Sequence, residues 1–147
     1  MARDWIKFPE LRNSELDLYW ESPHKQIFEN FTATVSKVID GDTIRVIWDE
    51  RDFDFPVRFL GTNSPEMNED GGEESRNWLR DIILGEEVDI LINPKQRVGK
   101  FGRILGTIIH DGINMNEDII RTGHATTFEL RNAGKIPDID RLLEDKI

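Results

Sequence analysis

Cysteine is absent from this chain of 147 residues, so neither a disulfide nor a thiolate metal site can form. Histidine occurs only three times, at scattered positions, and we assign no metal or catalytic role to any of the three. The sequence also lacks an apolar run near the roughly 20 residues that span a bilayer. No continuous apolar segment typical of a secretory signal lies near the N-terminus. We therefore expect no membrane association, and the sequence favours an intracellular or phage-encoded setting.

Basic residues are too few to balance the acidic ones, because 29 Asp and Glu outweigh 19 Lys and Arg and leave a net charge of −10. A negative surface repels phosphate groups, which argues against nucleic-acid binding by the surface as a whole. The charge is uneven, however, since residues 1–92 carry −11 and residues 93–147 carry +1. Within this second part, residues 93–110 contain no acid and four cations, Lys95, Arg97, Lys100 and Arg103. This segment is either a basic loop on an acidic body or an ordinary solvated hairpin.

The length fits one domain with a single hydrophobic core. Residues 31–147 contain the regular strand and helix patterns, and they form the expected domain. Residues 1–30 contain Trp, Leu and Phe at a spacing that fits no single period, so we expect extended segments and turns that pack on the domain. A surface that binds a protein partner is the alternative for this N-terminal extension. We expect the protein to be a monomer.

Alternating apolar and polar residues predict five β-strands, over residues 31–36, 44–48, 55–60, 88–92 and 103–110. Pro56 indicates that the third strand begins with unpaired residues or lies at an edge. Apolar residues three and four positions apart predict a helix over 73–84, and shorter helices are expected over 117–122, capped by Asn116, and over 137–145. Three strands, a helix, two strands and then helices is the order of an OB-type barrel. The predicted fold is α+β, a five-stranded OB-like β-barrel with about three helices.

Two acidic residues flank a glycine in a predicted turn, at Asp40, Gly41 and Asp42. Two carboxylates in a tight turn can present hard oxygen ligands to Ca²⁺ or Mg²⁺. The same three residues are also ordinary turn composition, so the motif alone decides nothing. Arg58 lies inside the apolar strand 55–60. A charge there is either on the solvent face or buried with an anionic partner, which would be a carboxylate or a phosphate.

A polar loop follows this strand directly and contains Asn63, Ser64 and Glu66. Pro65 restricts Ser64 to an extended backbone, which could aim backbone carbonyls and Glu66 toward a common point. Arg103 stands at the start of the last predicted strand, after a glycine, and its guanidinium could bind phosphate through two N–H groups. Polar loops and hairpin arginines are common, so each of these residues also has a purely structural interpretation.

Together these motifs resemble the staphylococcal nuclease (thermonuclease) family. The resemblance rests on residues 38–43 (VIDGDT), 57–66 (VRFLGTNSPE), 100–103 (KFGR) and 115–123 (MNEDIIRTG). These segments occur in the family's order and on matching predicted elements, and the resemblance covers roughly residues 31–128. Residues 1–30 lie outside it, and the C-terminal helical part is shorter than in the family.

The resemblance implies a metal-dependent nuclease that hydrolyses phosphodiester bonds of DNA or RNA and leaves 3′-phosphate ends. Asp42 would be a direct ligand of one Ca²⁺ ion, and Asp40 beside it would shape the site. Asn63 and the backbone carbonyl of Ser64 would complete the protein ligands. Asn63 departs from the family, which usually has an aspartate there, so we expect weaker or altered metal binding rather than loss of the site.

The resemblance also assigns catalytic and substrate-binding roles. Glu66 would orient the attacking water and act as general base. Arg58 and Arg103 would bind the scissile phosphate and offset the charge that builds in the transition state. Lys100 and Phe101 would contact the substrate. Phe101 stands where the family has a tyrosine, so it could stack on a base but could not donate a hydroxyl to phosphate.

A non-catalytic OB-type module that binds nucleic acid or protein is the main rival to the nuclease interpretation. Degenerate members of such families usually lose the arginines or the glutamate. Arg58, Glu66 and Arg103 are all present here, which favours the enzyme.

Overall fold

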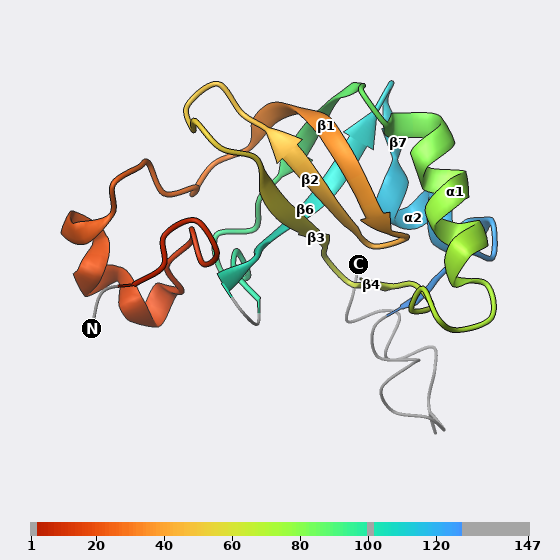
Figure 1. The fold of residues 1–147 in the computed structure, drawn as a ribbon, viewed down its shortest axis with the longest axis horizontal. Coiled ribbons are helices and arrows are strands. Elements are labelled where there is room, and N and C mark those ends of the chain that lie inside the picture. Colours follow the sequence, from red (N-terminus) through yellow and green to blue (C-terminus); the bar gives the residue numbers. More distant parts are fainter. Residues whose placement is uncertain (1–2, 100–101, 128–147) are drawn as a thin grey trace.

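A closed five-stranded barrel is the centre of the computed structural model, which describes residues 3–99 and 102–127 (Figure 1). Its strands are β1 (Phe31–Asp40), β2 (Thr43–Ile47), β3 (Phe55–Phe59), β5 (Glu87–Leu91) and β6 (Ile104–His110). They lie in the order β3-β2-β1-β5-β6, and β3 also pairs with β6 to close the barrel. The predicted OB-like α+β fold is confirmed.

Along each strand, buried residues alternate with more exposed ones, and the buried residues form the core of the barrel. On β3, Phe55, Val57 and Phe59 are buried inside, whereas Pro56 and Arg58 between them are only partly buried. Such a period of two is typical of a strand with one face in the core. The core joins buried residues of all five strands to one face of a helix, and includes Val35, Val46, Val57, Ile90, Ile104, Ile108, Leu79 and Ile83. Because apolar side chains fill the inside, outward-facing positions and strand ends remain for a functional site.

Closure of the barrel depends on a parallel pairing between β3 and β6. Val57 pairs with Ile104, and Arg58 pairs with Leu105. Pro56 precedes the first of these pairs and is paired with β2 alone. Proline has no N–H to donate, so it is tolerated where the strand has a neighbour on one side only. The prediction that the first residues of this strand are incompletely paired is thus consistent with the structure.

Two α-helices lie at one end of the barrel (Figure 1). The first, α1 (Gly72–Ile83), has acidic residues in its first turn, where the helix dipole favours them, and it buries Leu79 and Ile83 against the barrel. The second, α2 (Met115–Arg121), follows a hairpin of β6 with the short strand β7 (Ile113–Asn114). The helix predicted over residues 137–145 lies outside the described residues.

The cap of α2 differs from the prediction. Asn114, not Asn116, is the N-cap, since its side-chain oxygen accepts the Glu117 N–H at 3.1 Å. Asn116 is buried and bonds three backbone groups instead, at Ile108, Leu60 and Gly106. A further two-stranded sheet of β4 (Thr62–Asn63) and β8 (Thr126–Thr127) was not predicted. Strands of two residues are too short to show the alternation of apolar and polar residues that predicts a strand.

The N-terminal segment, residues 3–30, lies at the opposite end of the barrel from the α-helices (Figure 1). The expectation of only extended segments and turns is wrong here, because η1 (Asn13–Glu21) is a 3₁₀-helix. None of its residues is buried, so no amphipathic period marks it in the sequence. The segment contacts the barrel through the residues on either side of η1, including the buried Leu11 and Ile27. Within the described residues, no helix is both long enough and apolar enough to cross a membrane.

Candidate functional site

The turn between β1 and β2 brings two carboxylates together. Asp42 is only 5% exposed, and both of its oxygens are engaged. Oδ2 accepts the Ser64 N–H at 2.8 Å, and Oδ1 accepts the Thr43 hydroxyl at 3.0 Å. The Asp42 N–H in turn donates to Oδ1 of Asp40 at 3.0 Å, which closes the turn. These hydrogen bonds fix the orientation of both acidic side chains.

Gly41 allows this turn to approach the loop after β3. A Cβ atom at position 41 would lie 2.7 Å from the Cβ of Ser64 and 2.9 Å from the Cβ of Ser75. Carbon atoms do not pack that closely, so a glycine is required here. The close approach is what places Asp42 within hydrogen-bonding distance of Ser64.

Arg58 points from β3 toward the same turn. Its Nη2 lies 3.4 Å from Oδ2 of Asp42 and donates to Oδ1 of Asn63 at 3.2 Å. Its Nη1 donates to the backbone carbonyls of Phe59 and Thr62, at 3.0 and 2.5 Å. The Arg58 and Asp42 side chains are 15% and 7% exposed. Of the alternatives for this arginine, the structure supports a largely buried guanidinium with a carboxylate partner.

Negative charge is concentrated around the turn. Burial, together with the adjacent Asp42 carboxylate, raises the pKa of Asp40 to about 7, and the charge of Glu66 adds to this effect. Glu66 itself is exposed at the start of the loop, where its N–H donates to Oε1 of Glu69 at 2.7 Å. Asp40 is therefore within electrostatic range of both Asp42 and Glu66.

Arg103 immediately precedes β6, the strand that pairs with β3. Leu105 is the partner of Arg58, and alternation along an extended chain puts Arg103 on the same side of the sheet as Leu105. The carbonyl of Arg103 accepts the Gly99 N–H at 2.9 Å. The two predicted substrate-binding residues, Lys100 and Phe101, lie outside the described residues.

The loop between β5 and β6 contains one buried cation. Arg97 is 1% exposed, and its Nη2 lies 2.8 Å from Oε2 of the buried Glu10. Lys95 is exposed. Arg97 therefore fits neither a basic loop nor a solvated hairpin, the two alternatives for this segment, because its charge is compensated by a carboxylate 87 residues earlier in the chain. A linear sequence pattern does not reveal so distant a partner.

Two threonines that the sequence analysis did not single out complete the site. Thr43 hydrogen-bonds to Asp42, and Thr62 supplies a carbonyl that orients Arg58. The position of Thr43 directly after the acidic turn is a signal that could have identified it. The role of Thr62 depends on its backbone alone, so the sequence contains no signal for it.

The donor atoms at the turn fit a divalent cation in kind. Asp40 and Asp42 offer carboxylates, while the Asn63 amide and the Ser64 carbonyl are neutral oxygens of the type that Ca²⁺ accepts. In residues 3–99 and 102–127, no group of three or more Asp, Glu, His or Cys side chains is arranged for a metal. A cation here would therefore take the rest of its shell from neutral oxygens. It would also relieve the repulsion that helps raise the pKa of Asp40.

A five-stranded OB-type barrel with an acidic β1–β2 turn, faced by an arginine from β3, defines a class of staphylococcal-nuclease-like domains. The chain belongs to the family described as staphylococcal nuclease homologue, whose sequence model matches residues 56–146. The matched region contains Arg58, Asn63, Ser64, Glu66 and Arg103, and it begins after the acidic turn.

Several relatives carry nuclease names. The chain is 32% identical over 103 residues to a protein of Escherichia coli named as an uncharacterized endonuclease, which covers 69% of this chain and 64% of that protein. It is 26% identical over 99 residues to Endonuclease YncB of Bacillus subtilis, covering 63% and 46%. A probable staphylococcal-like nuclease of rice, Oryza sativa subsp. japonica, is 32% identical over 75 residues, covering 51% and 19%. The match thus spans less than two thirds of the length of these relatives.

Proposed function

We propose that this protein is a Ca²⁺-dependent nuclease that hydrolyses phosphodiester bonds of DNA, RNA or both and leaves 3′-phosphate ends. The observation that carries the proposal is the contact of Arg58 with both Asp42 and Asn63, which places a guanidinium against two oxygen donors suited to a cation. Positive charge beside a set of hard oxygen ligands suits an anionic phosphodiester. Membership of the family and the names of the relatives support the same activity.

Three groups would hold the cation, and a fourth would shape its site. Asp42 would be the direct carboxylate ligand, Asn63 and the Ser64 carbonyl would complete the protein ligands, and Asp40 would shape the site. When bound, the ion supplies Lewis-acid stabilisation of the charge that develops on the phosphoryl oxygens. The hydrogen bonds of Asp42 to Ser64 and Thr43 keep this carboxylate in place.

The reaction proposed is direct attack of water on phosphorus. Glu66 accepts a proton from the water as its oxygen bonds to phosphorus, and the P–O5′ bond breaks. The departing 5′ oxygen takes up a proton, which leaves a 5′-hydroxyl and a 3′-phosphate. Arg58 and Arg103 hold the phosphate and offset the negative charge of the transition state, and Lys100 and Phe101 contact the flanking nucleotides.

Digestion of end-labelled single-stranded DNA and RNA tests this proposal. We expect cleavage at low salt with millimolar Ca²⁺ and none with EDTA, and mapping of the products should find 3′-phosphate ends. Glu66→Gln and Arg103→Ala should each lower kcat by a factor of about 10² or more, which is the usual size of an acid–base or electrostatic contribution.

Glu74→Gln is a matched control for Glu66→Gln, since it removes one exposed carboxylate from the nearby first turn of α1. It should keep the kcat of the unmodified protein. No cleavage by the folded protein with Ca²⁺ or Mg²⁺ would contradict the proposal. A non-catalytic OB-type module that binds nucleic acid or protein would then be the better interpretation.

A further inference from the structure

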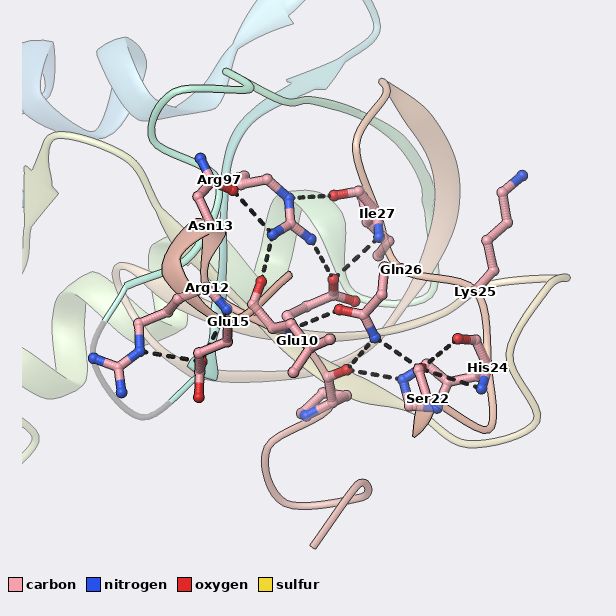
Figure 2. Close-up of polar contacts among 12 residues, drawn as sticks. Glu10, Arg12, Asn13, Glu15, Ser22, His24, Lys25, Gln26, Ile27 and Arg97 are labelled. Carbon is pink, nitrogen blue, oxygen red and sulfur yellow. Dashed lines mark hydrogen bonds and ion pairs between the residues drawn. The ribbon is translucent and has the colours of Figure 1, made fainter. Parts of the chain in front are cut away.

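A single buried carboxylate joins the N-terminal segment to two loops of the barrel. Glu10 is fully buried, and its Oε1 pairs with Nη2 of Arg51 while its Oε2 pairs with Nη2 of Arg97. Arg51 belongs to the loop between β2 and β3, and Arg97 belongs to the loop between β5 and β6. We call these three residues the Glu10 cluster. Figure 2 shows Glu10 and Arg97 facing each other within this network.

The rest of the Arg97 side chain is also bound to the N-terminal segment. Its Nε donates to the carbonyl of Ile27 at 2.7 Å (Figure 2). Its Nη1 donates to the carbonyl of Leu11 at 2.5 Å. The guanidinium lies 4.2 Å from the ring centroid of Phe28. The Arg97 side chain is therefore buried, and residues of the segment 10–28 surround it.

The backbone segment that contains Arg97 is paired with the one that contains Arg103. The Leu105 N–H donates to the Arg97 carbonyl at 2.9 Å, and the Gly99 N–H donates to the Arg103 carbonyl at 2.9 Å. Val98 forms a bridge with Ile104, the residue after Arg103. We call these two paired segments, residues 97–99 and 103–105, the hairpin. A displacement of Arg97 would thus reach Arg103 through the pairing of the hairpin.

The N-terminal segment touches this hairpin at a second point. Gly102, the residue before Arg103, packs so closely that an added Cβ would lie 3.3 Å from the Glu10 carbonyl and 3.4 Å from the Cβ of Phe8. The Arg3 side chain supports this stretch, because its Nη2 donates to the Glu10 carbonyl at 2.6 Å and its Nε donates to the Phe8 carbonyl at 2.9 Å. The N-terminal segment therefore contacts the chain on both sides of residues 100–101, at Arg97 and at Gly102.

We propose that Glu10 is a positioning residue for the nuclease reaction, and that the N-terminal segment acts through the Glu10 cluster to hold Arg103 beside Arg58. This inference rests on the proposed function. Glu10 contacts none of the residues proposed to bind metal or substrate, and of the two arginines that it pairs with, Arg97 is the one that belongs to the hairpin, so its carboxylate acts on Arg103 through Arg97. A guanidinium stabilises a transition state only when it is held in place beforehand, so loosening the hairpin lowers turnover more than substrate binding.

The variant Glu10→Gln tests this by removing the negative charge that compensates Arg51 and Arg97, with little change of shape. We expect kcat to fall at least tenfold, with KM for single-stranded DNA and the Ca²⁺ affinity changed less than twofold. In an Arg103→Ala background the same substitution should change kcat less than twofold, because the group through which Glu10 acts is already gone.

Arg45→Gln provides the matched control. It breaks an arginine–carboxylate pair of the barrel, with Asp54 at 3.1 Å, that does not involve the hairpin before β6. This variant should keep the unmodified kcat. A folded Glu10→Gln protein with unchanged kcat would overturn the inference. So would a loss of kcat that is equally large in the Arg103→Ala background, since that would reveal a general structural effect.

Amide hydrogen exchange tests the positioning without relying on activity. Glu10→Gln should raise exchange at Gly99 and Leu105 at least tenfold while the Phe59 amide, which donates to the Asp42 carbonyl at 2.8 Å, stays protected. An equal rise at all three amides would overturn the inference. If the unmodified protein does not cleave nucleic acid, the proposed function fails, whereas this exchange result still decides the link from Glu10 to the hairpin. Should Glu10→Gln not fold, Arg3→Gln is expected to show the same selective rise, and its absence would overturn the inference.

Discussion

At the scale of single residues, Asn63 is the most informative position of the site. Its side-chain oxygen accepts a hydrogen bond from Arg58 at 3.2 Å, so it is oriented by the same arginine that contacts Asp42. An amide offers a metal one neutral oxygen where a carboxylate would add a negative charge. Calcium affinity in oxygen sites depends on the number of charged ligands. Asn63, where the family resemblance leads us to expect an aspartate, should therefore change the Ca²⁺ affinity by a measurable amount.

We expect Asn63→Asp to bind Ca²⁺ more tightly, by about tenfold, which corresponds to about 1.4 kcal/mol. The added charge strengthens the metal site, although the nearby Arg58 offsets part of it. Calorimetric titration measures the affinity without reference to cleavage. Asn68→Asp adds the same charge at an exposed position of the same loop and should change the affinity much less. Equal affinities for Asn63→Asp and the unmodified protein would contradict the metal-ligand role of Asn63.

Individual site residues could be predicted to different degrees. Arg58 lies inside an apolar strand, and the sequence already required either exposure or an anion; the structure supplies Asp42. The positions of Asp40 and Asp42 followed from turn chemistry. The burial of Arg97 could not be predicted, because a charged residue in a loop with two glycines has the composition of a solvated hairpin, and its partner Glu10 is distant in sequence.

At the scale of secondary-structure elements, prediction succeeded where one face of an element is buried. The five barrel strands and α1 show the alternation or the helical period that a buried face imposes, and most of their predicted bounds lie within one residue of the structure. The first strand is the exception, because it was predicted to end at residue 36 and β1 continues to Asp40 through a stretch where register irregularities interrupt the alternation. η1 was missed because it buries no residue. The cap of α2 was placed at Asn116 instead of Asn114, since both asparagines are suitable caps and only tertiary contacts assign Asn116 to the barrel.

The N-terminal segment contains a histidine whose titration should affect stability. Nε2 of His24 lies 2.9 Å from the Pro9 carbonyl, and the ring contacts Trp5 and Phe53 edge to face. Burial lowers the pKa of His24, and the charges of Arg51 and Arg3 lower it further. The hydrogen bond with the Pro9 carbonyl and the charge of Asp52 raise it, but the net shift is downward.

The direction of the pH effect follows from proton binding. A histidine whose pKa is lowered on folding takes up its proton more readily in the unfolded chain, whose pKa is about 6.5. Stability is therefore lost as the pH falls through that value toward the folded pKa. We expect the free energy of unfolding, measured in urea, to decrease less between pH 7.5 and pH 5.5 in His24→Gln than in the unmodified protein. Identical decreases would show that His24 is not responsible.

At the scale of the whole molecule, the net charge of −10 has to be reconciled with the anionic substrate that we propose. The acidic residues belong mainly to residues 1–92, and Arg97 contributes no surface charge because it is paired with Glu10. Only a few basic side chains around the site are therefore available to bind phosphate groups. The protein should consequently engage a short stretch of nucleic acid and not a long one.

Salt dependence of binding measures how many phosphates are contacted. For the catalytically impaired Glu66→Gln variant with Ca²⁺, we expect the logarithm of the single-stranded DNA affinity to fall with a slope of about −2 against log salt, as for about three phosphate contacts. Removing the exposed charges of Glu73 and Glu74 should strengthen binding at low salt and leave the slope unchanged. A slope near zero would contradict phosphate recognition by these cations.

The parallel pairing of β3 with β6 also has a consequence for how the chain acquires its site. Val57 and Ile104 must find each other across an intervening stretch that includes α1 and β5, so their contact is non-local. Non-local contacts are entropically costly to form, and they slow folding. Arg58 belongs to this pairing and Arg103 immediately precedes it, whereas the Asp40–Asp42 turn belongs to a local hairpin. A newly made chain can therefore assemble its acidic turn from neighbouring residues, but it fixes the strands of its two arginines only through a distant pairing.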